Sequence, residues 1–125
     1  MAKILILEDM GPRVDQFMTE WFKHELYIVN KPGAAVNILM TLKIDLVTLD
    51  HDLGMTGNHE PSDENSGFAV AEWLGAAANS PTWTLPEHML AHTWSQVGAK
   101  NMINVCPRLL HIPFGDDYFK KITIP

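Results

Sequence analysis

The stretch KILILED, residues 3–9, decides the fold of this chain. Its apolar run ends abruptly in two acids, a pattern typical of a parallel strand that is buried on both faces. The stretch LVTLDHD, residues 46–52, repeats the pattern with a second apolar run and a second acidic end. Because the carboxyl ends of parallel strands lie at one edge of a sheet, we expect the two acidic ends to meet there.

Further apolar runs alternate with helical patterns around these two stretches. The runs predict three more strands, at 26–29, 89–93 and 109–114. Apolar residues at intervals of three and four predict four helices, at about 11–25, 35–42, 66–78 and 95–106. Strands and helices in alternation, joined by right-handed crossovers, predict an α/β doubly wound, flavodoxin-like fold. Its five-stranded parallel sheet is expected in the order 2-1-3-4-5.

The first helix is expected to bury one apolar stripe against the sheet. The residues that recur at helical spacing in it are Val14, Phe17, Met18, Trp21 and Phe22.

The chain leaves few residues for a final helix. Residues 115–125 predict one helical turn at 116–121 or a short edge strand at 121–124. A shortened or missing final helix would uncover the sheet face beside the first strand. We therefore expect Phe114, Tyr118 and Phe119 to cover that face, or a second copy of the chain to cover it in a homo-oligomer.

Length and charge limit the possible functions. The 125 residues, 46% of them hydrophobic, predict one domain over 1–125, and no apolar run approaches the length of a membrane span. A formal net charge of -6 weighs against binding to duplex DNA. No Lys or Arg lies between Lys43 and Lys100, which favours a bound cation in that half. A single cysteine, Cys106, and no secretory pattern lead us to expect a cytoplasmic protein.

Four acidic residues follow the first and third predicted strands, namely Glu8, Asp9, Asp50 and Asp52. Carboxylates brought this close repel one another, and a hard divalent cation relieves the repulsion. Carboxylate oxygens suit Mg²⁺ or Mn²⁺, so these four residues are the predicted metal ligands. The alternative is that they point into solvent or cap helices.

Two histidines fall at the same predicted edge, His51 between two acids and His92 at the end of the fourth strand. Imidazoles exchange protons near neutral pH, so the pair could act as general base and general acid on a phosphate. The alternatives are a hydrogen-bonded core histidine at His92 and a metal ligand at His51. Residues 52–66 form a long polar connection, a candidate lid or binding loop, in which His59 could be a further ligand.

The segment after His92 is a candidate anion site. Its predicted phosphate-binding residues are Thr93, Ser95, Gly98 and Lys100, because a helix beginning near Ser95 would direct its amides at the strand ends. A plain helix cap without a ligand fits the same sequence. Trp94 and Trp83 could stack on a base, although most tryptophans in a chain of this size belong to the core or its rim.

The acidic pair, Asp50 and Thr93 resemble the receiver domains of two-component response regulators, over nearly the whole chain. LDHDLG at 49–54, SGF at 66–68 and HT at 92–93, followed by Gly98-Ala99 and Asn101-Met102, resemble a narrower group, the cyclic-phosphate-processing receiver-like family. That resemblance implies a phosphoesterase acting on cyclic phosphates in nucleic-acid repair or conflict systems, with acidic metal ligands and added histidines. The chain departs from receivers in having Ile112 before Pro113, where they carry a lysine. It also has Ser95 where the narrower family usually has Asn.

Three functions follow in order of preference. The first is a metal-dependent phosphoesterase that opens a cyclic phosphate of a nucleotide or RNA end. The second is a non-catalytic receiver-like module that binds a protein or small ligand. The third is a receiver domain that accepts a phosphoryl group on Asp50.

Overall fold

The computed structural model describes residues 1–53 and 65–124. The strands are β1 (Lys3–Leu7), β2 (Glu25–Val29), β3 (Leu46–Leu49), β4 (His88–Ala91) and β5 (Leu110–His111). The helices are α1 (Gly11–Glu20), α2 (Pro32–Thr41), α3 (Gly67–Ala77) and α4 (Gln96–Val105), followed by the 3₁₀ turn η1 (Phe119–Lys121). Every predicted strand and helix is therefore present. Residues 54–64, which include His59 and most of the predicted binding loop, lie outside the described residues.

The sheet is parallel and has the predicted order β2-β1-β3-β4-β5. Leu7 of β1 pairs with Leu49 of β3, and Leu49 pairs in turn with Ala91 of β4. The residues that follow these three strands therefore emerge side by side at one edge.

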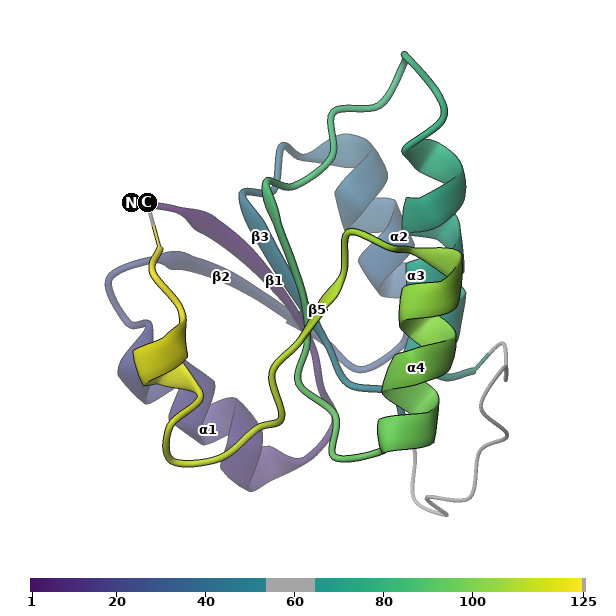
Figure 1. Cartoon of the computed structure of the whole chain (residues 1–125). Coiled ribbons are helices and arrows are strands. Elements are labelled where there is room, and N and C mark those ends of the chain that lie inside the picture. Colours follow the sequence, from purple (N-terminus) through teal and green to yellow (C-terminus); the bar gives the residue numbers. More distant parts are fainter. Residues whose placement is uncertain (54–64, 125) are drawn as a thin grey trace.

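Different helices lie over the two faces of the sheet (Figure 1), and each face carries its own apolar core. Helices α2, α3 and α4 cover one face, over Leu5, Leu7 and Val47 among others. Helix α1 and the C-terminal segment cover the other face, over Ile4, Ile6 and Leu46. Because side chains alternate along a strand, neighbouring residues of β1 belong to different cores.

Helices α3 and α4, which begin at the site edge, each have a serine as N-cap. Ser66 accepts a hydrogen bond from the amide of Phe68 at the start of α3, and Ser95 accepts one from Gly98 at the start of α4. At Gly67 an added Cβ would lie 1.8 Å from the carbonyl oxygen of Asp50, so only glycine allows α3 to start this close to the strand end.

Several predicted boundaries and part of one predicted face are wrong. Helix α1 ends at Glu20 rather than near Glu25, and β5 has only two residues. Phe17 and Trp21 of the predicted stripe are buried as predicted, Trp21 as the C-cap of α1. Met18 and Phe22, which were also predicted to be buried, are 52% and 71% exposed, and Arg13 is buried beside Phe17 instead.

The end of the chain covers the α1 face of the sheet itself. Phe114 and Tyr118 are buried, and Phe119 packs against the same core. Of the two forms predicted for this segment, the structure has the helical turn, as η1. A homo-oligomer was expected through this face only if the face were uncovered, and the chain's own residues cover it. No helix within 1–53 and 65–124 is long and apolar enough to cross a membrane.

Candidate functional site

Glu8 and Asp50 lie next to each other because β1 and β3 pair up to their last residues. Both side chains are buried, at 1% and 4% exposure. Asp9 is exposed, and the side chain of Asp52 is 39% exposed. The predicted acidic cluster is thus divided into two buried members and two that reach solvent.

The Glu8 carboxylate is fully engaged with the protein. One oxygen accepts the amides of Asp9 and Met10 at 3.1 Å each. The other lies 2.8 Å from His92 Nε2 and 3.4 Å from the Arg13 guanidinium. Burial would raise the pKa of Glu8, but the His92 hydrogen bond, the Met10 amide and the Arg13 charge together lower the pKa to about 2. Glu8 is therefore an ionised structural anion.

His92 belongs to a buried chain of hydrogen bonds. Its Nδ1 lies 2.8 Å from the Thr48 hydroxyl, which in turn lies 2.6 Å from the Tyr118 hydroxyl. Complete burial lowers the pKa of His92, so the ring is neutral near pH 7 although Glu8 acts in the opposite direction. A neutral ring that donates from Nε2 to Glu8 accepts from Thr48 at Nδ1, and Thr48 then accepts from Tyr118. This polarity gives every proton of the chain an acceptor.

Arg13 is the site residue that the sequence analysis missed. It reaches from α1 to within 3.4 Å of Glu8 and 3.8 Å of Asp50, with only 8% of its surface exposed. Its guanidinium lies 4.2 Å from the ring centroid of Trp94 and 5.3 Å from that of Phe114. One signal was available, because a basic residue five positions after Glu8 falls in the first turn of α1. Ile112 stands directly before Pro113, and Arg13 is the cation beside Asp50 in the described structure.

Asp50 has the largest pKa shift among the acidic side chains of the site. Burial and the neighbouring Glu8 charge raise the pKa of Asp50 to about 8, against smaller opposite effects of Arg13 and the His51 amide. That amide donates to Asp50 Oδ1 at 2.9 Å. Asp50 is therefore largely protonated at neutral pH.

His51 is held between Asp52 and Gly98. Its Nδ1 lies 2.7 Å from Asp52 Oδ1, and its ring is 1% exposed. A Cβ added at Gly98 would lie 2.5 Å from His51 Cγ, so Gly98 makes space for the imidazole. The Gly98 amide, which we predicted to receive a phosphate, donates to Ser95 instead.

A pocket of about 250 Å³ opens at this edge, lined by Asp9, Met10, Arg13, Asp50, Asp52, Thr93, Trp94 and Ser95. It brings together five of the ten predicted site residues from the ends of three strands. Glu8, His51 and His92 are buried and do not line it, and Lys100 is exposed outside it.

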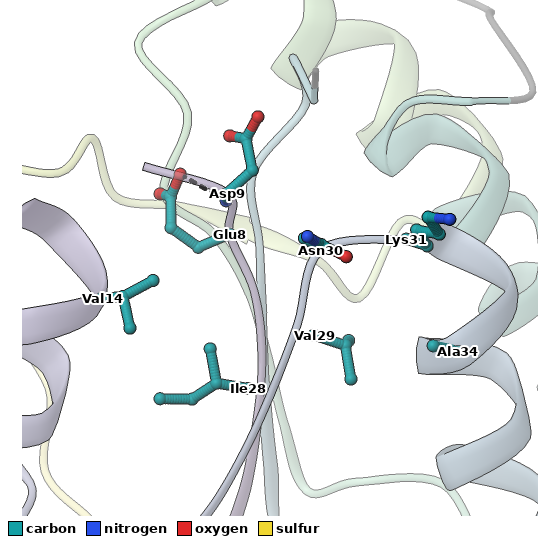
Figure 2. A pocket seen from close by; sticks show the side chains of 8 residues that line it. All are labelled: Glu8, Asp9, Val14, Ile28, Val29, Asn30, Lys31 and Ala34. Atoms are coloured by element: carbon teal, nitrogen blue, oxygen red, sulfur yellow. Dashed lines mark hydrogen bonds between the residues drawn. The ribbon is translucent and has the colours of Figure 1, made fainter. Parts of the chain in front are cut away.

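A second pocket, of about 400 Å³, lies over the ends of β1 and β2 (Figure 2). Its lining includes Glu8, Asp9, Asn30 and Lys31. Figure 2 shows the Glu8 carboxylate turned back onto the Asp9 amide, while the Asp9 carboxylate points the other way. Asp9 is thereby shared by both pockets.

The donor set fits a hard divalent cation. Asp9, Asp50 and Asp52 line the smaller pocket, and carboxylate oxygens are ligands that a hard divalent cation prefers. Burial, and after it the Glu8 charge, raise the pKa of Asp50, and a cation beside Asp50 would offset both effects. Ligand atoms of Glu8, Asp50 and His92 also lie within 4.8 Å of one another. Binding between those three would break the hydrogen bond between His92 and Glu8, so the open carboxylates are the better ligands.

Comparison with known proteins identifies one family. The model of the cyclic-phosphate processing receiver domain matches residues 3–108. No curated protein matches the chain in sequence.

Solved structures that resemble this chain include receiver domains of response regulators. The Mn²⁺-bound form of response regulator Rcp1 has a TM-score of 0.67 at 16% identity, over 100% of this chain and 99% of that one. A CheY-like receiver domain from Methanospirillum hungatei JF-1 has a TM-score of 0.64 at 16% identity, over 97% and 90%. The complex of histidine kinase ThkA with response regulator TrrA gives 0.64 at 18%, over 97% and 94%. At these identities the likeness establishes the fold.

Proposed function

This chain belongs to the family of cyclic-phosphate processing receiver domains, and from that premise we propose that it is a metal-dependent phosphoesterase. The substrate would be a cyclic phosphodiester, such as the 2′,3′-cyclic phosphate of a nucleotide or an RNA end. One observation supports this most directly. Three carboxylates, a guanidinium and two hydroxyl residues line a single pocket at the carboxyl ends of the strands, where doubly wound folds bind ligands.

Asp9, Asp50 and Asp52 would hold Mg²⁺ or Mn²⁺. When bound, the cation supplies positive charge that withdraws electron density from the phosphoryl oxygens. Thr93 and Ser95 are suited to donate to the phosphate, because each hydroxyl oxygen accepts a backbone amide and so keeps its own proton for donation. Arg13 adds a positive charge to the lining of the pocket.

We assign proton transfer to His51. Its Nδ1 lies 2.7 Å from Asp52 Oδ1, and a carboxylate at one ring nitrogen orients an imidazole for proton transfer. His51 would take a proton from the attacking water as the new P–O bond forms. The bond from phosphorus to one ribose oxygen breaks, and that oxygen takes its proton from solvent.

His92 would act as a positioning residue rather than as the second acid or base that the sequence suggests. Both of its ring nitrogens are engaged, with Glu8 and Thr48, and the ring is completely buried. His92 holds Glu8, and Glu8 in turn contacts Arg13.

One observation favours a non-catalytic binding module instead. Neither His51 nor His92 lines the pocket, so a ligand could bind there without meeting an acid or base.

The test is hydrolysis of 2′,3′-cyclic AMP with Mn²⁺, followed by chromatography of the nucleoside monophosphates. We expect turnover that falls by about 10²- to 10⁴-fold in His51→Ala and is lost in Asp50→Asn. Asp116→Asn, at an exposed acid distant in sequence from both strand ends, is the matched control. Binding of Mn²⁺ and nucleotide without turnover between pH 6 and 9 would establish the binding module.

A further inference from the structure

Trp94 is an exposed but immobilised aromatic wall of the carboxylate pocket. Its indole nitrogen donates to the carbonyl of Phe114, and the Arg13 guanidinium lies against its ring at 4.2 Å from the centroid. Even so, 66% of its surface is exposed. Two contacts thus fix the ring while most of it stays open to solvent.

The other tryptophans have ordinary packing roles. Trp21 is buried in the core beneath α1, and Trp73 packs against Trp83 with ring centroids 5.6 Å apart. Over 1–53 and 65–124, neither apolar core includes Trp94. Trp94 instead lines the pocket together with Asp50 and Thr93. Core packing therefore does not explain why a tryptophan stands here.

An indole at the rim of a pocket lined by charged and hydroxyl side chains suits a ligand with a flat aromatic group. The pocket floor is charged and polar, whereas the Trp94 wall offers a flat π-surface whose position costs no further ordering on binding. A nucleobase presents the matching flat face, and stacking needs no sequence-specific hydrogen bond. A base is also uncharged at neutral pH, so the surrounding carboxylates do not repel it.

We propose that Trp94 is the specificity-determining residue of this site and stacks on the base of the substrate. The substrate is then a nucleoside cyclic phosphate or the terminal nucleotide of an RNA, rather than a cyclic phosphate that lacks a base. This inference rests on the proposed phosphoesterase function for its kinetic readout, and on binding alone for its second readout.

The test compares 2′,3′-cyclic AMP with glycerol 1,2-cyclic phosphate, which has no base. The wild type is expected to prefer the nucleotide in kcat/KM. In Trp94→Ala that preference should fall by about 5- to 100-fold, the range given by base stacking on an aromatic side chain. Trp94→Phe should retain part of the preference, and Trp83→Ala should retain all of it.

Two results would overturn the proposal. The wild type could use both substrates equally well, or Trp94→Ala could lower both rates alike, which would show that Trp94 serves only to shield Arg13. If neither substrate is hydrolysed, the phosphoesterase function fails, and calorimetric binding of the two compounds with Mn²⁺ decides the role of Trp94. Stacking is supported if the wild type binds the nucleotide more tightly than the compound without a base and Trp94→Ala abolishes this difference. Equal binding of both compounds by the wild type refutes stacking.

Discussion

The imidazole of His92 donates to the Glu8 carboxylate across 2.8 Å, and neither side chain is accessible to solvent. The contact joins the end of β4 to the end of β1 across the intervening strand β3. Glu8 also accepts two backbone amides and contacts Arg13, so this buried pair fixes the position of Arg13 in the lining of the pocket. The first predictions concern its energetics.

His92→Ala should destabilise the fold by about 3–5 kcal/mol, because it leaves the buried Glu8 charge without its closest partner. Urea unfolding at pH 7.5 measures the loss. His51→Ala is the comparison, since Asp52 is partly exposed and can be solvated when the imidazole is removed. A His92→Ala protein as stable as the wild type would mean that the pair does not support the fold.

Thr48→Val should cost about 1–3 kcal/mol, because it deprives both His92 Nδ1 and the Tyr118 hydroxyl of a buried partner. Tyr118→Phe removes only the end of the chain and should cost about 0.5–1.5 kcal/mol. The double variant should lose less than the sum of the two single losses, since both act on one chain of hydrogen bonds. Additive losses in urea unfolding would contradict a connected chain.

The stability of the metal-free protein should fall as the pH rises from about 6.5 to 8 and should level off above that. Asp50 has a pKa of about 8 in the folded chain against 3.8 ordinarily, so between these two values the folded state holds a proton that the unfolded chain has released, and a rise in pH favours unfolding until Asp50 ionises near 8. His92, with a lowered pKa, acts in the opposite direction but only below about pH 6.5. In EDTA, Asp50→Asn should flatten the decline between about pH 6.5 and 8. An equally steep decline in that variant would assign it to another group.

Mn²⁺ should raise the melting temperature, and by more at pH 8.5 than at pH 6, because Asp50 must lose its proton to bind. At a metal concentration about 100 times Kd the gain is about 2.7 kcal/mol. Asp50→Asn should abolish most of the gain, and Glu72→Gln, at an exposed acid on α3, should leave it intact. A melting temperature unchanged by millimolar Mn²⁺ at pH 8.5 would exclude the site.

Gly98→Ala should displace the His51 ring, since the added Cβ would lie 2.5 Å from it. We expect a loss of about 1–3 kcal/mol and reduced turnover, with Mn²⁺ binding retained. Gly33→Ala is the matched control, because nothing lies within 4 Å of the added atom and the change should be neutral or slightly stabilising. Wild-type turnover in Gly98→Ala would separate His51 from the chemistry.

The amino-acid pattern alone predicts the sheet and the edge of the sheet at which the site lies. Buried parallel strands require unbroken apolar runs. Each of the stretches KILILED and LVTLDHD contains such a run followed by acidic residues, and so predicts both a strand and its acidic end. Crossover handedness then left few arrangements, so the strand order and the meeting of Glu8 with Asp50 followed. The caps at Ser66 and Ser95 were equally local, because a cap is made by neighbours in the chain.

Which of these polar groups face solvent and which face each other depends on how the helices pack against the sheet. Arg13 is buried, and Met18 and Phe22 are exposed, because the position of α1 against the sheet set its rotation. Side chains continue to alternate past the end of β4, so His92 faces the α1 side of the sheet. There His92 meets Thr48, which is 44 positions away in the sequence, and Thr48 meets Tyr118, which is 70 positions away. Spacing in the sequence holds no information on such contacts, since they depend on how separate layers pack in space.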